Sequence, residues 1–140
     1  GYTPIFKPTN VKLNIVDYSI SGDKKLGNQI YLKLNNLYRS LEKTGKEKDV
    51  FISIAVSKNK NSTSKDTTGK ILSYRISLST TIKIQDLAGQ NILNENFTLS
   101  SSYDVQDQYS ETVELENTSV NNLINQTYQD ILIKLTDTIL

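Results

Sequence analysis

The segment Ile71–Asp86 reads ILSYRISLSTTIKIQD and sets the pattern on which the fold depends. Apolar side chains recur at every second position from Leu72 to Ile84, with Thr80 as the exception. The positions between them carry Ser, Thr, Arg and Lys. Because successive side chains of a strand point to opposite faces, this alternation predicts a long β-strand with one buried face and one hydroxyl-rich face in water.

Three further segments around it predict strands. The sequence Asp86-Leu-Ala-Gly-Gln-Asn91 predicts a turn, and Ile92 to Val105 then returns as the hairpin partner. Upstream, residues 49–57 (DVFISIAVS) are almost continuously apolar and β-branched, which is typical of a strand covered on at least one face. Residues 11–20 (VKLNIVDYSI) show strand periodicity again.

Two segments have helical spacing instead. From Leu26 to Leu41, apolar residues recur at steps of three and four, which predicts a helix over about residues 24–43 with Asp23 as its N-cap. A second apolar stripe runs from Val113 to Ile139, which predicts a helix over 110–139. Glu111, near its start, suits the positive end of the helix dipole.

The resulting order is β-α-β-β-β-α, and it predicts an α+β fold. The first two strands flank a helix and are expected to run parallel, whereas the last three form an antiparallel meander. We therefore expect a two-layer sandwich, in which a mixed four-stranded sheet is covered on one face by two helices. Residues 1–10, which hold both prolines, are expected to be an extended arm, and residues 11–140 a single domain.

Residues 58–70 (KNKNSTSKDTTGK) contain no apolar side chain, and we interpret them as a mobile connector. This connector carries four lysines and a single acid, Asp66. The lysines are Lys58, Lys60, Lys65 and Lys70. From the residues alone two interpretations stay open: a solvated loop, or a loop that attracts phosphate or an anionic head group.

The composition excludes several classes of function. The chain has no Cys and no His, which excludes thiol nucleophiles, Ser-His-Asp triads, zinc ribbons and imidazole metal ligands. The net charge of +1 provides no field for nucleic acid, and no nucleotide-binding glycine motif occurs. Ser-x-x-Lys occurs four times, at Ser21, Ser40, Ser57 and Ser62, in keeping with the abundance of both residues. We expect a protein that is not an enzyme and needs no cofactor or metal.

Short motifs spread along the chain resemble the LPS-assembly lipoproteins of the LptE (RlpB) family, as found in alphaproteobacteria. The opening Gly1-Tyr-Thr-Pro-Ile-Phe6 is similar to the mature start of the family, which follows a lipidated Cys. Tyr74-Arg-Ile76, the turn at Asp86, Ser102-Tyr-Asp-Val105 and the terminal amphipathic helix also resemble the family pattern. The chain departs from that pattern in its last helix, which is rich in Asn and carries Glu near its start.

The resemblance implies a non-enzymatic lipoprotein on the periplasmic side of the outer membrane. Such a protein plugs and supports the LptD β-barrel and contacts lipopolysaccharide (LPS) during export to the outer leaflet. The resemblance also implies a membrane contact only through an N-terminal lipid anchor on a Cys before Gly1. On this basis Lys58, Lys60, Lys65 and Lys70 are expected to contact the phosphates of LPS. Two alternatives remain: a stand-alone periplasmic lipoprotein module that binds an anionic glycolipid, and a small hydrolase that uses Ser and Lys.

Overall fold

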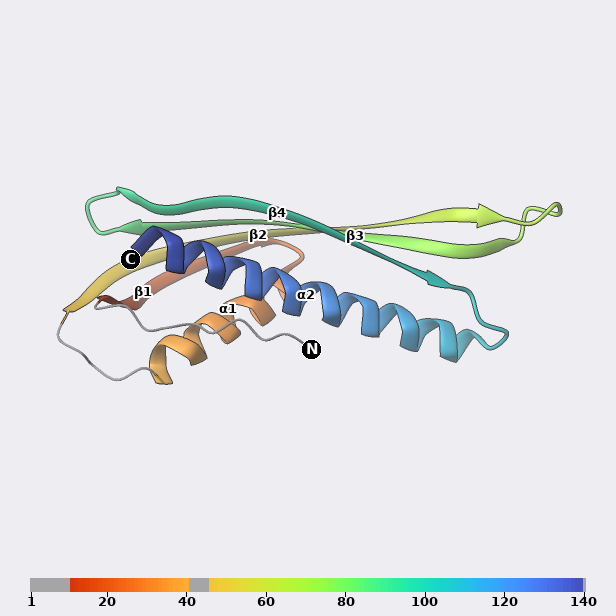
Figure 1. Ribbon diagram of the computed structural model, residues 1–140, viewed down its shortest axis with the longest axis horizontal. Helices are drawn as coiled ribbons and strands as arrows, with labels where there is room; N and C mark the ends of the chain where they lie inside the picture. The colour runs from red at the N-terminus through yellow and green to blue at the C-terminus, as the bar shows by residue number, and fades with distance from the viewer. Residues whose placement is uncertain (1–10, 41–45, 140) are drawn as a thin grey trace.

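The computed structural model describes residues 11–40 and 46–139, and it has the predicted order of elements. Strand β1 (Val11–Gly22) is followed by helix α1 (Lys24–Ser40) and strand β2 (Lys46–Lys65). Strands β3 (Ile71–Asp86) and β4 (Asn91–Asp104) lead to helix α2 (Tyr109–Ile139). The sheet order is β1-β2-β3-β4, with β1 parallel to β2 and the other neighbours antiparallel (Figure 1). The expected α+β sandwich is confirmed, whereas the expected arm at residues 1–10 lies outside the described residues.

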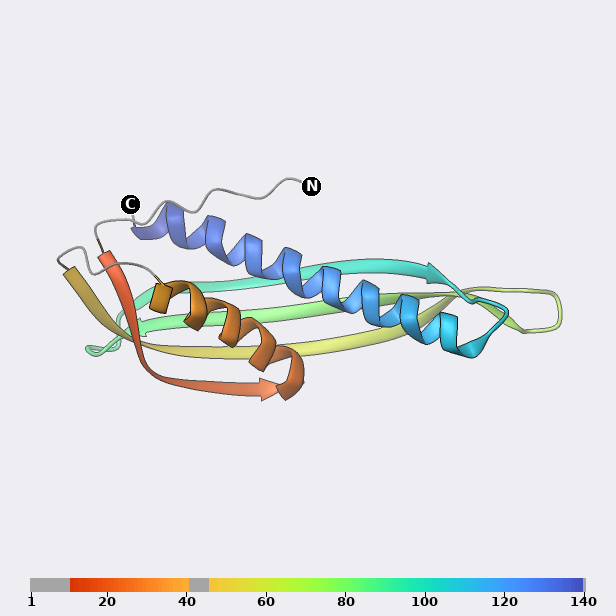
Figure 2. The same cartoon turned by 90° about the horizontal axis from the view of Figure 1, so that it is seen from below.

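The two helices cover the same face of the sheet, and the other face is left open (Figure 2). The core lies between the layers and is built from every second residue of the strands. In β2 the buried apolar side chains are Val50, Ile52, Ile54 and Val56, and in β3 they are Ile76, Leu78, Ile82 and Ile84. The helices contribute Leu26, Ile30, Leu34 and Tyr38 from α1, and Val120, Leu123, Ile124, Ile131, Leu132 and Leu135 from α2. The strand and helix periodicities in the sequence therefore correspond to real buried faces.

The junction between β1 and α1 is tight because β2 passes close to it. The backbone N–H of Asp23 donates to the Val56 carbonyl at 2.7 Å, and the Asp23 carboxylate accepts from the Leu26 N–H at 3.1 Å. Asp23 is thus the predicted N-cap. Gly22 before it has φ +75°, and a Cβ there would lie 2.1 Å from the Val56 carbonyl oxygen. Only glycine fits this turn.

The prediction of a mobile connector at residues 58–70 is wrong. Strand β2 continues to Lys65 and pairs with β3 along this stretch, for example at Lys58↔Leu78 and Lys60↔Ile76. A five-residue turn from Asp66 to Lys70 then closes the β2–β3 hairpin. The stretch lacks apolar residues because β1 and α1 end before it, so that its inner face is only partly covered. The hairpin extends beyond the rest of the molecule (Figures 1 and 2).

Candidate functional site

The open face of the sheet carries hydroxyl and amide side chains in rows that cross the strands. Neighbouring side chains hydrogen-bond to one another: Ser77 and Ser100 at 2.8 Å, and Ser79 and Thr98 at 3.3 Å. The Asn96 amide donates to the Thr81 hydroxyl at 2.7 Å. The same face also holds a few charged side chains on β3 and β4, namely Arg75, Lys83 and Asp104. We call this surface the hydroxyl face.

The hydroxyl face is suited to contact a polar surface and not a hydrocarbon one. Within the described residues no element covers it, and its side chains keep spare donors and acceptors beyond their mutual bonds. Short Ser and Thr side chains lose little conformational entropy when a partner orders them.

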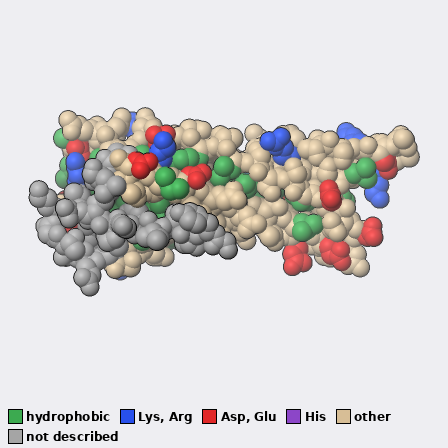
Figure 3. Space-filling model, in the orientation of Figure 1, with side chains coloured by type: hydrophobic (Ala, Val, Ile, Leu, Met, Phe, Trp, Pro, Cys, Tyr) green, Lys and Arg blue, Asp and Glu red, His purple; other side chains and the backbone are tan. Residues whose placement is uncertain are grey.

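A second candidate lies where the β2–β3 hairpin separates from the start of α2. This cavity, of about 360 Å³, is called the tip cleft here. It is lined by Lys60, Lys70, Ile71, Tyr74, Val105, Gln106, Asp107, Tyr109, Thr112, Val113 and Glu116. On the face shown in Figure 3, acidic side chains gather over the start of α2, and basic side chains lie on the hairpin arm opposite. Tyr109 is 84% exposed at the rim of the tip cleft.

Lys60 is the centre of a charged network in the tip cleft. Its Nζ lies 2.7 Å from Oε1 of Glu116 and 4.4 Å from the centre of the Tyr74 ring. The Tyr103 hydroxyl donates to the same Glu116 oxygen at 2.6 Å. Tyr103 also stacks on Tyr74, with 5.8 Å between the ring centres. The ammonium is therefore held between a carboxylate and an aromatic ring, and its charge is largely neutralised.

The network shifts the pKa values of its members in the directions that these contacts require. The hydrogen bonds from Lys60 and then Tyr103 lower the pKa of Glu116. The bond to Glu116 raises the pKa of Lys60. Desolvation, followed by the bond to Glu116, raises the pKa of Tyr103 to about 12. At neutral pH the three groups are a carboxylate, an ammonium and a neutral phenol.

The structure separates the four lysines that the sequence placed on one loop. Lys60 and Lys70 line the tip cleft, and Lys70 is exposed. Lys58 points to the helix side of β2, where it lines a different cavity with residues of α1 and α2. Lys65 is exposed at the end of β2 and lines neither cavity. The lysines therefore form no single cluster, although two of them share a cleft.

Sequence reasoning missed the aromatic and acidic partners in the tip cleft. A signal for one contact was present, because hairpin partners lie symmetrically about the turn at Asp86–Asn91. This symmetry pairs Tyr74 with Tyr103, as observed. The position of Glu116 depends on how α2 crosses the sheet, and no local pattern encodes that angle.

No protein-family model matches the chain, and none of the curated proteins matches it. The fold is nevertheless similar to solved structures. A "putative lipoprotein" from Caulobacter crescentus has 11% identity and a TM-score of 0.58, over 91% of this chain and 88% of the other. A minor lipoprotein from Acinetobacter baumannii has 18% identity and a TM-score of 0.52, over 84% and 93%. A "putative neuraminyllactose-binding hemagglutinin homolog" from Helicobacter pylori has 9% identity and a TM-score of 0.52, over 97% and 91%. At these identities the likeness shows a common fold.

No helix in the described part of the chain is long and apolar enough to cross a membrane. The described residues also include no group of three acidic side chains placed to hold a metal ion.

Proposed function

We propose that this chain is a non-enzymatic, lipid-anchored outer-membrane protein of the LptE type, which plugs and supports the LptD β-barrel and contacts LPS during export. The observation that carries the proposal is the hydroxyl face. Strands β3 and β4 present a polar surface, rich in Ser, Thr and Asn, that no part of the described chain covers, while β2 adds Phe51, 41% exposed, to the same face. A plug needs such a surface, because the lumen of an outer-membrane barrel is polar.

Two further observations support this proposal. The fold is similar to those of two proteins described as lipoproteins, from Caulobacter crescentus and Acinetobacter baumannii. The segment Gly1-Tyr-Thr-Pro-Ile-Phe6 resembles the start of mature proteins of the LptE family, which follows a lipidated Cys. One Cys that carries more than one acyl chain gives stable anchoring on the periplasmic side of the membrane.

The tip cleft is the proposed place of LPS contact. Lys70 is exposed at a cavity that also holds apolar and aromatic side chains, and this combination suits a phosphorylated lipid. Lys65 lies at the other end of the same turn. Lys60 contributes less because Glu116 already neutralises it. Lys58 does not line this cleft and reaches it only through its charge, which acts on Glu116.

LPS binding by the purified domain tests this contact. The double variant Lys65→Ala/Lys70→Ala should bind LPS several-fold more weakly than the parent, and the affinity of the parent should fall with salt because exposed charges are screened. The control is Lys83→Ala on the hydroxyl face, which should bind like the parent. Equal affinity for all three proteins, without salt dependence, contradicts LPS contact at the tip cleft.

Co-purification tests the plug itself. The full-length gene product, tagged at its C-terminus and expressed in its own organism, should bring down one large outer-membrane barrel protein in near-equal amount from detergent extracts. Recovery of the tagged protein alone contradicts the plug. The upstream coding sequence should also place a Cys directly before the residue numbered Gly1, and any other residue there contradicts the lipid anchor.

A stand-alone module that binds an anionic glycolipid is the second candidate. The observation in its favour is the Helicobacter pylori neighbour, whose description names binding of neuraminyllactose, an acidic sugar. A chain that binds acidic glycolipid and brings down no barrel supports this candidate over the plug. The hydrolase alternative predicts covalent labelling by a serine-directed fluorophosphonate probe, and we expect no label.

A further inference from the structure

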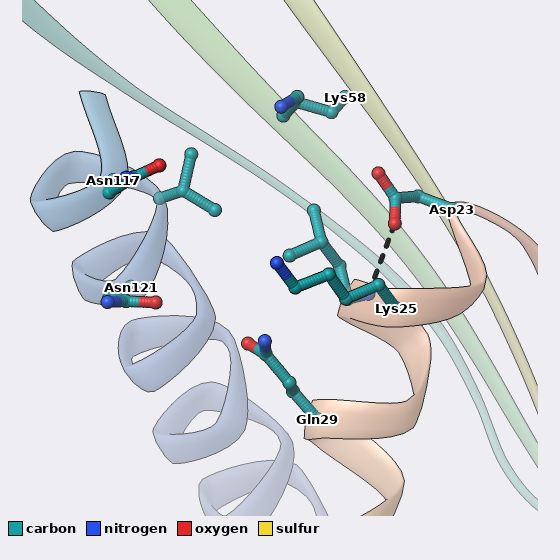
Figure 4. Close-up of a pocket in the computed structure, with 8 residues that line it drawn as sticks. Asp23, Lys25, Gln29, Lys58, Asn117 and Asn121 are labelled. Carbon is teal, nitrogen blue, oxygen red and sulfur yellow. Dashed lines mark hydrogen bonds between the residues drawn. The ribbon is translucent and has the colours of Figure 1, made fainter. Parts of the chain in front are cut away.

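Helices α1 and α2 leave a furrow between them on the side opposite the hydroxyl face. It comprises two cavities of about 310 and about 450 Å³. Both are lined by Gln29 and Asn121, so the two adjoin. Figure 4 shows the first cavity, with Lys25 and Gln29 pointing from α1 toward α2 and with Lys58 above them on β2. We call the combined cavity the interhelical furrow.

The two helices contribute matching rows of polar side chains to the walls of this furrow. The α1 row is Lys25, Gln29 and Lys33, and the α2 row is Asn117, Asn121 and Asn125. Both rows have a spacing of four residues, which places their members on one face of each helix. At 1.5 Å per residue, each row is about 12 Å long. The rows therefore flank a groove long enough for more than one sugar ring.

The floor of the furrow is apolar, whereas its walls are polar. Leu26, Val120 and Ile124 form part of the lining and are buried. Leu32 lines the second cavity and is 52% exposed, which is unusual for so large an apolar side chain. An apolar strip between amide rows matches a sugar, which presents C–H groups on one face of its ring and hydroxyls around the edge.

The furrow carries an excess of positive charge. Lys25, Lys33 and Lys58 line it, and within the described part of the chain none of them forms an ion pair. The one acid in the lining is Asp23, whose carboxylate caps α1 through the Leu26 N–H. Lys33 lies 5.8 Å from the centre of the Tyr128 ring. The charge thus favours a ligand with negative groups.

We propose that the interhelical furrow binds an anionic oligosaccharide. The amides of Gln29, Asn117, Asn121 and Asn125 donate to and accept from sugar hydroxyls, since each amide offers both functions. The ammonium groups of Lys25, Lys33 and Lys58 pair with carboxylate or phosphate groups on the sugar. Two sources share this chemistry: the core oligosaccharide of LPS and a free acidic polysaccharide. The furrow and the hydroxyl face lie on opposite sides of the sheet. Binding of a sugar in the furrow therefore does not depend on contact between the hydroxyl face and a barrel.

NMR titration of the ¹⁵N-labelled protein tests the proposal with four probes: an oligogalacturonate tetramer, neutral maltotetraose, delipidated LPS core oligosaccharide and inorganic phosphate. At least one acidic sugar should shift the side-chain amide signals of Gln29, Asn117, Asn121 and Asn125. Maltotetraose should bind about ten-fold more weakly, or about 1.4 kcal/mol, and phosphate alone should leave these signals in place. The tighter of the two acidic sugars identifies the source.

A pair of variants separates the furrow from the rest of the surface. Gln29→Ala/Asn121→Ala should lower the affinity for the acidic sugar about ten-fold. Asn36→Ala/Asn122→Ala removes two exposed amides of the same helices outside the furrow lining and should leave the affinity unchanged. The backbone spectra show whether both variants are folded. Any one of four results overturns the proposal. Maltotetraose binds as tightly as the acidic sugars, or the signal shifts are confined to residues of the tip cleft. Alternatively, both double variants lose the same affinity, or neither acidic sugar binds at millimolar concentration.

Discussion

The Lys60 ammonium and the Glu116 carboxylate lie 2.7 Å apart and join the far half of β2 to the first half of α2. Beyond the end of β1, the residues of β2 that point toward the helices are no longer apolar. Lys58, Lys60 and Ser62 occupy these inward positions, in line with the core residues of the same strand. The Lys60–Glu116 pair, together with Tyr103, therefore replaces hydrophobic packing at this end of the molecule.

This pair makes the stability of the fold depend on pH in the acid range. Because Lys60 and Tyr103 lower the pKa of Glu116 below its ordinary value of 4.5, its contribution is fully present above that value. It is lost as the pH falls through the lower pKa of the folded state. The pair is partly exposed, so we expect a contribution of no more than about 1 kcal/mol. Urea melts at pH 7 and pH 3 should show a smaller acid-induced loss for Glu116→Gln than for the parent.

The control for this prediction is Glu114→Gln, since Glu114 is exposed on the same helix. Its urea melts should follow the parent at both values of pH. If Glu116→Gln loses as much stability between pH 7 and pH 3 as the parent does, the pair does not stabilise the fold.

The packing of both helices on one sheet face predicts large effects of core truncation. Leu34 of α1 and Ile131 of α2 are fully buried. Leu34→Ala and Ile131→Ala should each lower the free energy of unfolding by about 2–5 kcal/mol, because each leaves a cavity in the core. Leu32→Ala, on the exposed side of α1, should cost under about 1 kcal/mol. Urea melts of Leu34→Ala and Ile131→Ala that match the parent would show that the helices do not pack as described.

Thr80 interrupts the apolar stripe of β3 at a fully buried position. Its hydroxyl has no hydrogen-bond partner among the described residues. Thr80→Val keeps the shape and removes the buried unsatisfied group, so the free energy of unfolding should rise by about 1 kcal/mol. Thr127 is also buried, but its hydroxyl donates to the Leu123 carbonyl at 2.7 Å, so Thr127→Val should give no such gain. A destabilised Thr80→Val protein in thermal melts would contradict this account.

Gly22 should tolerate no side chain. A Cβ at this position would overlap the Val56 carbonyl oxygen, and its φ of +75° is costly for other residues. Gly22→Ala should therefore destabilise the protein by more than about 2 kcal/mol. Gly69 also has a positive φ, of +86°, but a Cβ there meets nothing within 4 Å, so Gly69→Ala should cost only about 1 kcal/mol. Equal midpoints in urea for the two variants would contradict the steric argument.

The helices and strands could be predicted from the sequence, because along most of the chain the spacing of apolar residues agrees with which side chains are buried. It failed at residues 58–65, where Lys58 and Lys60 occupy inward positions that would otherwise be apolar. A local signal for the correct answer was present. Asp66-Thr-Thr-Gly69-Lys70 repeats the Asp-x-x-Gly-x spacing of the turn at Asp86, and in both turns the Asp carboxylate accepts from the N–H four residues later. Positive φ at Gly69 and Gly89 completes the match.

The candidate sites depended on information that the sequence distributes over distant segments. The hydroxyl face could be predicted, because alternation in one strand fixes which residues share a face. The tip cleft and the interhelical furrow could not, since both depend on how α2 crosses the sheet and α1. The spacing of Asn117, Asn121 and Asn125 is visible in the sequence, but only the structure places Gln29 opposite them.

Site-specific photocrosslinking tests the central claim, that the hydroxyl face contacts a barrel. A benzophenone amino acid at Ser79 or Thr98, in the full-length protein within its own cells, should give one adduct with a large outer-membrane barrel protein. The same group at Asn122, on the exposed side of α2, should give that adduct weakly or not at all. Absence of the adduct from both sheet positions, or its appearance only from Asn122, would contradict the claim.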